Sequence, residues 1–73
     1  MKINEEVFLK ELGQRIAQLR KERNIKQVEF AAKLNIEDSA LRRIESGRTN
    51  PTTKTLLRIA QELNLSMKEL FDF

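Results

Sequence analysis

Residues 27–46 read QVEFAAKLNIEDSALRRIES, and this stretch decides the fold. Its apolar residues recur at helical spacing on both sides of Asn35, which predicts two short helices, at about 27–34 and 38–46. Asn35 suits the tight turn between them because asparagine tolerates positive φ better than most residues other than glycine. Ile36 is the apolar residue that anchors this turn in the core.

The two short helices must cross steeply, and each needs particular side chains at the contact. Ala31 is small enough for the crossing point, while Leu41 and Ile44 lie one turn apart on the inner side of the second helix. The apolar side chains that we expect at this contact are Val28, Phe30, Ala31, Leu34, Ala40, Leu41 and Ile44.

A longer helix precedes this pair. Asn4 is a good N-cap, and Glu5 and Glu6 favour the first turn of the helix that follows. Its apolar stripe consists of Phe8, Leu12, Ile16 and Leu19. Asn24 is expected to end it in the left-handed conformation. Gly13 interrupts the stripe, either at a tolerated cost of about 1 kcal/mol or because a neighbour packs closely there.

Gly47 ends the second short helix, and Asn50 before Pro51 forces an extended step. Thr52 is expected to cap a fourth helix, at about 53–64. Its apolar residues are Leu56, Leu57, Ile59, Ala60 and Leu63. Ser66 and Glu69 form a capping box for a short fifth helix that ends near Phe71. The sequence thus predicts an all-α fold in one domain, residues 1–73.

The composition excludes several classes of function. The chain has no cysteine, histidine or tyrosine, so it lacks the commonest metal ligands and general bases. We therefore expect no enzyme activity, no cofactor and no metal. The N-terminus lacks the apolar core of a signal peptide, and no apolar run approaches the ~20 residues of a membrane span. We expect a cytoplasmic protein without membrane contact or a small-molecule effector.

Positive charge is concentrated in the middle of the chain. The net charge is +3, yet residues 15–54 hold ten basic and five acidic side chains, a surplus of five. This distribution suits a nucleic-acid-binding surface, although an ordinary solvated helical surface explains it about as well.

Several short segments together carry a family resemblance. They are LGQRI at 12–16, LRKERN at 19–24, residues 27–34, IESGR at 44–48, NPT at 50–52, LLRIA at 56–60 and LNLS at 63–66. On these segments the chain resembles the Cro/C1-type (xenobiotic response element, XRE) family of phage and bacterial repressors. The resemblance implies a compact five-helix, lambda-repressor-like fold and double-stranded DNA binding through a helix-turn-helix at about residues 27–46.

The resemblance also implies three sets of site residues. The base-reading positions are Asp38, Ser39, Arg42 and Arg43; the phosphate-contacting positions are Lys26, Gln27, Arg48, Thr49 and Asn50; and Arg20 with Glu45 is a buried ion pair. The sequence departs from the family at Lys26 and Glu37, which stand where a capping Ser or Thr is usual.

Alternatives remain for the exposed face of the second short helix. Arg43 either reads a guanine through two hydrogen bonds or is a solvated surface arginine, and we favour the guanine contact. Arg42 either contacts DNA or pairs with Asp38, four residues earlier. Asp38 accepts a hydrogen bond from cytosine, pairs with Arg42, or simply favours the helix dipole. Ser39 is a weaker base or phosphate contact.

The C-terminus offers a tentative dimer interface, at Met67, Leu70, Phe71 and Phe73. The alternative is that Leu70 and Phe71 cover the core while Phe73 frays. A homodimer on a two-fold-symmetric operator would place two reading helices ~34 Å apart. We expect a transcription regulator, most readily a repressor. The competing hypothesis is a helical protein-interaction module or antitoxin-type component that has kept the fold with little DNA binding.

Overall fold

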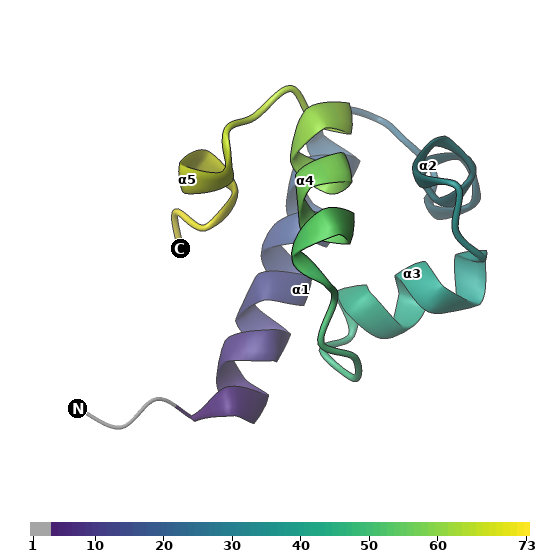
Figure 1. Cartoon of the computed structure of the whole chain (residues 1–73). Helices are drawn as coiled ribbons and strands as arrows, with labels where there is room; N and C mark the ends of the chain where they lie inside the picture. Colours follow the sequence, from purple (N-terminus) through teal and green to yellow (C-terminus); the bar gives the residue numbers. More distant parts are fainter. Residues whose placement is uncertain (1–3) are drawn as a thin grey trace.

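The computed structural model describes residues 4–73, which form five α-helices and no strand (Figure 1). The helices are α1 (Glu5–Glu22), α2 (Gln27–Leu34), α3 (Asp38–Glu45), α4 (Thr53–Glu62) and α5 (Met67–Leu70). The all-α, five-helix prediction is confirmed. None of the helices in these residues is long and apolar enough to cross a membrane.

Three helices begin with the side-chain caps that the sequence predicts. Asn4 Oδ1 accepts from the Val7 N–H at 3.1 Å, and Thr52 Oγ1 accepts from the Thr55 N–H at 3.1 Å. Ser66 and Glu69 exchange hydrogen bonds of 3.1 and 3.0 Å in a complete capping box. Each cap satisfies an N–H that the first turn of a helix leaves without a partner.

Left-handed asparagines end three of the helices. Asn24, Asn35 and Asn64 have φ angles of 58°, 57° and 58°. Asn24 and Asn35 were expected in the turns that end their helices, whereas Asn64 was expected to be about the last residue of the fourth helix. The structure ends α4 at Glu62, because the chain turns at Asn64 and the Leu65 N–H donates to the Ala60 carbonyl at 2.8 Å.

The core lies between α1, the α2–α3 pair and α4, with α4 crossing in front of α1 in Figure 1. Its fully buried large side chains are Ile16, Phe30, Leu34, Leu41, Ile59, Leu63 and Leu70. Three residues of the expected apolar stripes are in fact exposed, Val28 by 67%, Leu57 by 45% and Phe8 by 40%. Val28 and Leu57 point away from the buried faces of their helices, since each step along a helix turns the side-chain direction by about 100°. Phe8 lies one turn before the buried Leu12 and packs against the rings of Phe71 and Phe73.

Gly13 allows a close contact between α1 and the end of α3. A Cβ built on this residue would lie 2.5 Å from the carbonyl oxygens of Ile44 and Glu45, at the end of α3. The close-packing alternative for this glycine is therefore correct. Gly47, with φ +78°, lies against the backbone of Lys10 in the same manner. Both glycines fix the end of α3 against α1 and so set the direction in which α3 projects.

The C-terminus returns to the beginning of α1. The rings of Phe8 and Phe71 are stacked at 6.3 Å, and Phe73 lies 5.7 Å from Phe8 and 6.2 Å from Phe71. Arg15 of α1 donates to the Glu69 carbonyl at 2.9 Å and holds α5 in place. Phe8, Phe71 and Phe73 are named the aromatic cluster below.

Candidate nucleic-acid interface

The second helix of the motif, α3, lies at one edge of the molecule, between α2 and α1 (Figure 1). Leu41 and Ile44 are buried in the core, whereas Arg42 and Arg43 are exposed. This division follows from the helical period, because residues 41 and 44 share one face and residues 42 and 43 turn away from it. Two arginines are therefore presented to solvent on a rigid support.

An open groove of about 1140 Å³ runs between α1 and α3. Of the predicted site residues, it is lined by Gln27, Ser39, Arg42, Arg43, Glu45 and Arg48. Its other wall is formed by Gln14, Ala17, Gln18, Lys21 and Glu22 of α1, which the sequence analysis did not assign to the site. Lys26, Asp38, Thr49 and Asn50 lie outside this groove.

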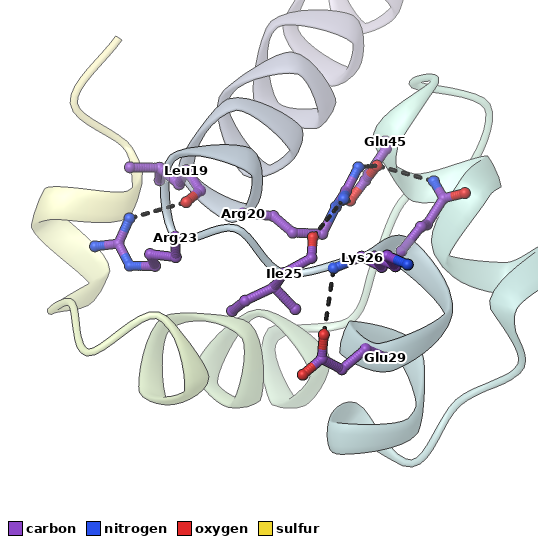
Figure 2. A network of polar contacts seen from close by, with 8 residues as sticks. Leu19, Arg20, Arg23, Ile25, Lys26, Glu29 and Glu45 are labelled. Carbon is purple, nitrogen blue, oxygen red and sulfur yellow. Dashed lines mark hydrogen bonds and ion pairs between the residues drawn. The ribbon is translucent and has the colours of Figure 1, made fainter.

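Glu45 connects three helices through one carboxylate (Figure 2). Arg20 of α1 donates to it twice, from Nε to Oε2 at 2.8 Å and from Nη2 to Oε1 at 3.0 Å. Gln27 of α2 adds a third hydrogen bond, from Nε2 to Oε1 at 2.9 Å. The Arg20 and Glu45 side chains are only 8% and 7% exposed. The pair is therefore a buried support for the base of α3.

Arg20 also orients the chain that leads into α2. Its Nη1 donates to the Ile25 carbonyl at 2.8 Å, in the turn that Figure 2 shows between α1 and α2. The Gln27 Nε2 uses one of its two N–H groups on Glu45, which helps to fix where α2 begins. Its second N–H and the backbone N–H groups at the start of α2 are donors of the kind that a phosphate accepts from.

The two helices of the motif lack the side-chain caps seen elsewhere. Within residues 4–73, neither the Lys26 side chain at the start of α2 nor the Glu37 side chain at the start of α3 accepts a hydrogen bond from the first turn. At α2 the reverse contact is present, since the Lys26 N–H donates to Glu29 Oε1 at 3.4 Å. In the first turn of α3 the Ala40 N–H donates to the Glu37 carbonyl at 3.0 Å. Among the described residues, no side-chain cap occupies the remaining first-turn N–H groups of α2 and α3, which can bind solvent or an anion.

The exposed face of α3 contains one ion pair. Arg42 Nη1 lies 3.3 Å from Asp38 Oδ2, and both side chains are substantially exposed. Such a pair contributes at most about 0.5 kcal/mol and exchanges readily with solvent or a ligand. Neither ion pair found in residues 4–73 involves Arg43, which lines the groove.

The loop after α3 continues along the same edge. The Arg48 N–H donates to the Arg43 carbonyl at 2.9 Å, so the exposed Arg48 side chain follows directly from α3. Pro51 is buried and anchors the loop, while Thr49 is half-buried and Asn50 exposed. These residues form a polar rim beside the groove.

The four residues expected at a dimer interface have different surroundings. Leu70 is fully buried in the core, so it has no surface to offer a partner, and this expectation was wrong for that residue. Met67 and Phe71 are half-buried. Phe73 is 48% exposed and packs in the aromatic cluster instead of fraying. Phe8 of α1 is exposed and contacts both Phe71 and Phe73, so it belongs to the same surface. Val7, which precedes Phe8 in the sequence, is exposed as well.

The α1 residues that line the groove were not predicted as site residues, although their spacing in the sequence is regular. Gln14, Ala17, Gln18 and Lys21 are spaced by three, one and three residues, which places them on one helix face. This polar face lies beside the apolar stripe of the same helix. The spacing of these residues predicts that they share one helix face. Only the packing of α1 against α3 brings that face to the groove.

The profile of the helix-turn-helix family matches residues 16–70, which cover all of α2, α3, α4 and α5 and the second part of α1. The chain belongs to the XRE-type helix-turn-helix family. The family assignment agrees with the geometry of α2 and α3 and with the resemblance found in the sequence.

Two relatives of this helix-turn-helix chain come from Bacillus phage phi105. The "ImmF control region 10 kDa protein" is 46% identical over 61 residues, covering 84% of this chain and 68% of the relative. The "Immunity repressor protein" is 41% identical over 59 residues, covering 81% of this chain and 41% of the relative. The chain therefore corresponds to less than half of the longer repressor.

Solved structures share the fold. The restriction-modification controller protein C.AhdI from Aeromonas hydrophila superimposes with a TM-score of 0.83 at 28% identity, covering 86% of this chain and 96% of that one. SinR, a master regulator for biofilm formation solved in complex with DNA, gives a TM-score of 0.75 at 37% identity, covering 84% and 98%.

Proposed function

We propose that this chain is a sequence-specific DNA-binding transcription regulator that inserts α3 into the major groove. The observation that supports this most directly is the rigid mounting of α3, with Glu45 locked by Arg20 and with Arg42 and Arg43 free of the core. The major groove of B-DNA is about 12 Å wide and admits one α-helix. An arginine on such a helix recognises guanine through O6 and N7.

The site residues divide into base-reading and positioning sets. Arg43 is the principal base reader, with Ser39, Arg42 and Asp38 as further contacts to base edges. Phosphates on the flanking strands are met by the open N-terminus of α2 and by polar side chains around the groove, which fix the register of the protein on DNA. These side chains are Lys26, Gln27, Arg48, Thr49 and Asn50.

We infer that the regulator is a repressor and acts as a homodimer on a two-fold-symmetric operator. The phage relatives bear the names of an immunity repressor and an immunity control-region protein, which favours repression. One α3 spans only a few base pairs, whereas two copies would read half-sites ~34 Å apart. The exposed part of the aromatic cluster is the surface that we assign to the dimer contact.

Selection of binding sites from random duplex DNA tests this proposal. We expect enrichment of a two-fold-symmetric site, and binding that weakens with salt by a slope of about −0.9 per phosphate contacted. Failure to bind any duplex, or a flat salt response, would overturn the proposal. That outcome would favour the second candidate, a protein-interaction module, for which the carboxylates of Glu37 and Asp38 at the start of α3 are the supporting observation.

A further inference from the structure

The groove between α1 and α3 has a second polar wall that the proposed function does not use. Gln14, Ala17, Gln18 and Lys21 of α1 line it opposite Arg42 and Arg43. We name these four α1 residues the α1 wall. Ala17 is half-buried and small, so it forms a floor, while the glutamines and Lys21 are exposed and carry hydrogen-bond donors.

The charges in the groove favour an anionic occupant. Four basic side chains line it, namely Lys21, Arg42, Arg43 and Arg48. The acidic lining residues are Glu22 and Glu45, and the Glu45 carboxylate is neutralised by Arg20 at 2.8 Å. Glu22 is therefore the single exposed acid against four exposed bases in the lining of this groove.

We propose that the α1 wall is a track for one DNA backbone strand, with Lys21 as a phosphate contact and Glu22 as an opposing charge that limits affinity. This inference rests on the proposed function, because α3 must first occupy the major groove. A helix in the major groove of DNA has a phosphate backbone on each side, and α1 forms the wall opposite α3 in the groove of the protein. Glutamine and lysine donors are common phosphate contacts.

The existing contacts of the α1 wall are weak enough to exchange. Gln18 Nε2 donates to Glu22 Oε2 at 3.3 Å, and both side chains are exposed. On DNA, a phosphate oxygen would replace the Glu22 carboxylate as the acceptor for Gln18. The backbone of α1 stays in place, because Gly13 and Arg20 fix it to the end of α3.

The test is the salt dependence of binding by the full chain to a duplex that it selects and to a scrambled duplex. Lys21→Ala should lower the magnitude of the slope of log affinity against log salt by about 0.9. When salt is raised from 50 to 200 mM, both proteins lose affinity, and the factor lost by the wild type should be about 3.5 times the factor lost by Lys21→Ala. The loss of affinity should be similar on both duplexes, because a phosphate contact carries no sequence information.

Two further variants sharpen the result. Lys33→Ala removes the same charge from an exposed position on α2 outside the groove, and its slope should equal that of the wild type. Glu22→Gln removes the opposing charge and should tighten binding to both duplexes. All three substitutions are at exposed positions, so the melting temperatures should stay close to the wild-type value.

The outcomes separate this inference from the function on which it rests. If the wild type binds duplex DNA but Lys21→Ala keeps the wild-type slope, the α1 wall does not contact the backbone and the inference is overturned alone. A loss confined to the selected duplex would also overturn it, since that would make Lys21 a base contact. If the wild type binds no duplex, both proposals fail.

Discussion

Glu45 is the residue on which the placement of α3 depends. Its carboxylate accepts hydrogen bonds from Arg20 of α1 and from Gln27 of α2, and its side chain is 7% exposed. Neighbouring charges on the same helix, such as Arg42, are exposed and loosely paired. Two ion pairs a few residues apart therefore have different consequences when they are cut.

Arg20→Ala should lower the free energy of unfolding by about 3–5 kcal/mol, because it leaves the buried Glu45 carboxylate without its cation. Thermal and urea denaturation measure this loss. Arg42→Ala is the matched control and should change stability by no more than about 0.5 kcal/mol, since its pair with Asp38 is exposed. Equal effects of the two variants would contradict the structural role assigned to Arg20.

Arg43→Ala should cost about 1–3 kcal/mol in binding to the selected duplex and relax discrimination at one base pair. The variant should fold as the wild type does, because the Arg43 side chain is exposed. Titrations against the selected duplex and its single-base-pair variants measure both effects. An equal loss on every sequence would instead identify Arg43 as a phosphate contact.

At the scale of the helices, the contact between α1 and α3 depends on the absence of a side chain. Residue propensity favours alanine over glycine inside a helix by about 1 kcal/mol. At Gly13, however, a Cβ would lie 2.5 Å from two backbone carbonyl oxygens of α3. The backbone of α3 would have to move. The free energy that this displacement costs exceeds the free energy that alanine gains over glycine as a helix former.

Gly13→Ala should therefore destabilise the protein by about 1–3 kcal/mol, as overpacking does, and displace α3 from its position on α1. The melting temperature and DNA affinity should both fall. Gln14→Ala, one position along the same helix and exposed, is the control for the backbone and should leave the melting temperature nearly unchanged. A stabilised Gly13→Ala would show that the helices separate freely.

The short α5 depends on its capping box, which is sensitive to pH. The Ser66 backbone N–H, and after it the Ser66 hydroxyl, stabilise the charged Glu69 carboxylate and hold its pKa below the ordinary value of 4.5. Because the folded pKa is lowered, this contribution to stability is complete above the ordinary value and is lost as the pH falls through the folded value.

Glu69→Gln should make the stability of the protein less dependent on pH in this acidic range. Glutamine retains an oxygen that accepts from the Ser66 N–H, but it does not titrate. Melting temperatures between pH 3 and 6 should show the wild type losing stability relative to the variant as the pH falls below about 4.5. If the melting temperatures of the wild type and the variant changed with pH in parallel, titration of Glu69 would not contribute to the stability of the capping box.

At the scale of the whole molecule, the aromatic cluster joins the two ends of the described chain. Phe8 and Phe73 each leave a large part of their rings exposed, and Val7 adjoins them in sequence. Phe71 is partly buried and packs against the core, which fixes the cluster in place. Exposed aromatic rings on a rigid base are typical of the residues that dominate protein interfaces.

Phe73→Ala should weaken homodimer formation by about 1–2 kcal/mol, as loss of an interface aromatic does. Binding to an isolated half-site should be unchanged, whereas binding to the two-fold-symmetric site should weaken. Sedimentation equilibrium and titration of both duplexes measure these effects. The control is Leu57→Ala, which removes an exposed apolar side chain on α4 outside the aromatic cluster. It should change neither homodimer formation nor binding to the two-fold-symmetric site.

The sequence by itself determined where the five helices begin and where α1 and α2 end. Asn4, Thr52 and Ser66 cap the helices that they were expected to cap, and Asn24 and Asn35 end two others. These features depend on hydrogen bonds between residues three to five positions apart, which local side-chain chemistry controls. The resemblance to the family followed from short sequence segments, and the resemblance implied the base-reading positions on α3.

Only the tertiary structure decided which exposed faces meet. Val28 and Leu57 are apolar yet turn to solvent, Phe8 pairs with the C-terminus, and the α1 wall forms one side of the groove. Each depends on the angle and distance at which helices cross, and those are set by contacts such as Gly13 with the end of α3, about thirty residues away. Helical periodicity fixes the face of each side chain but not the neighbour that this face meets.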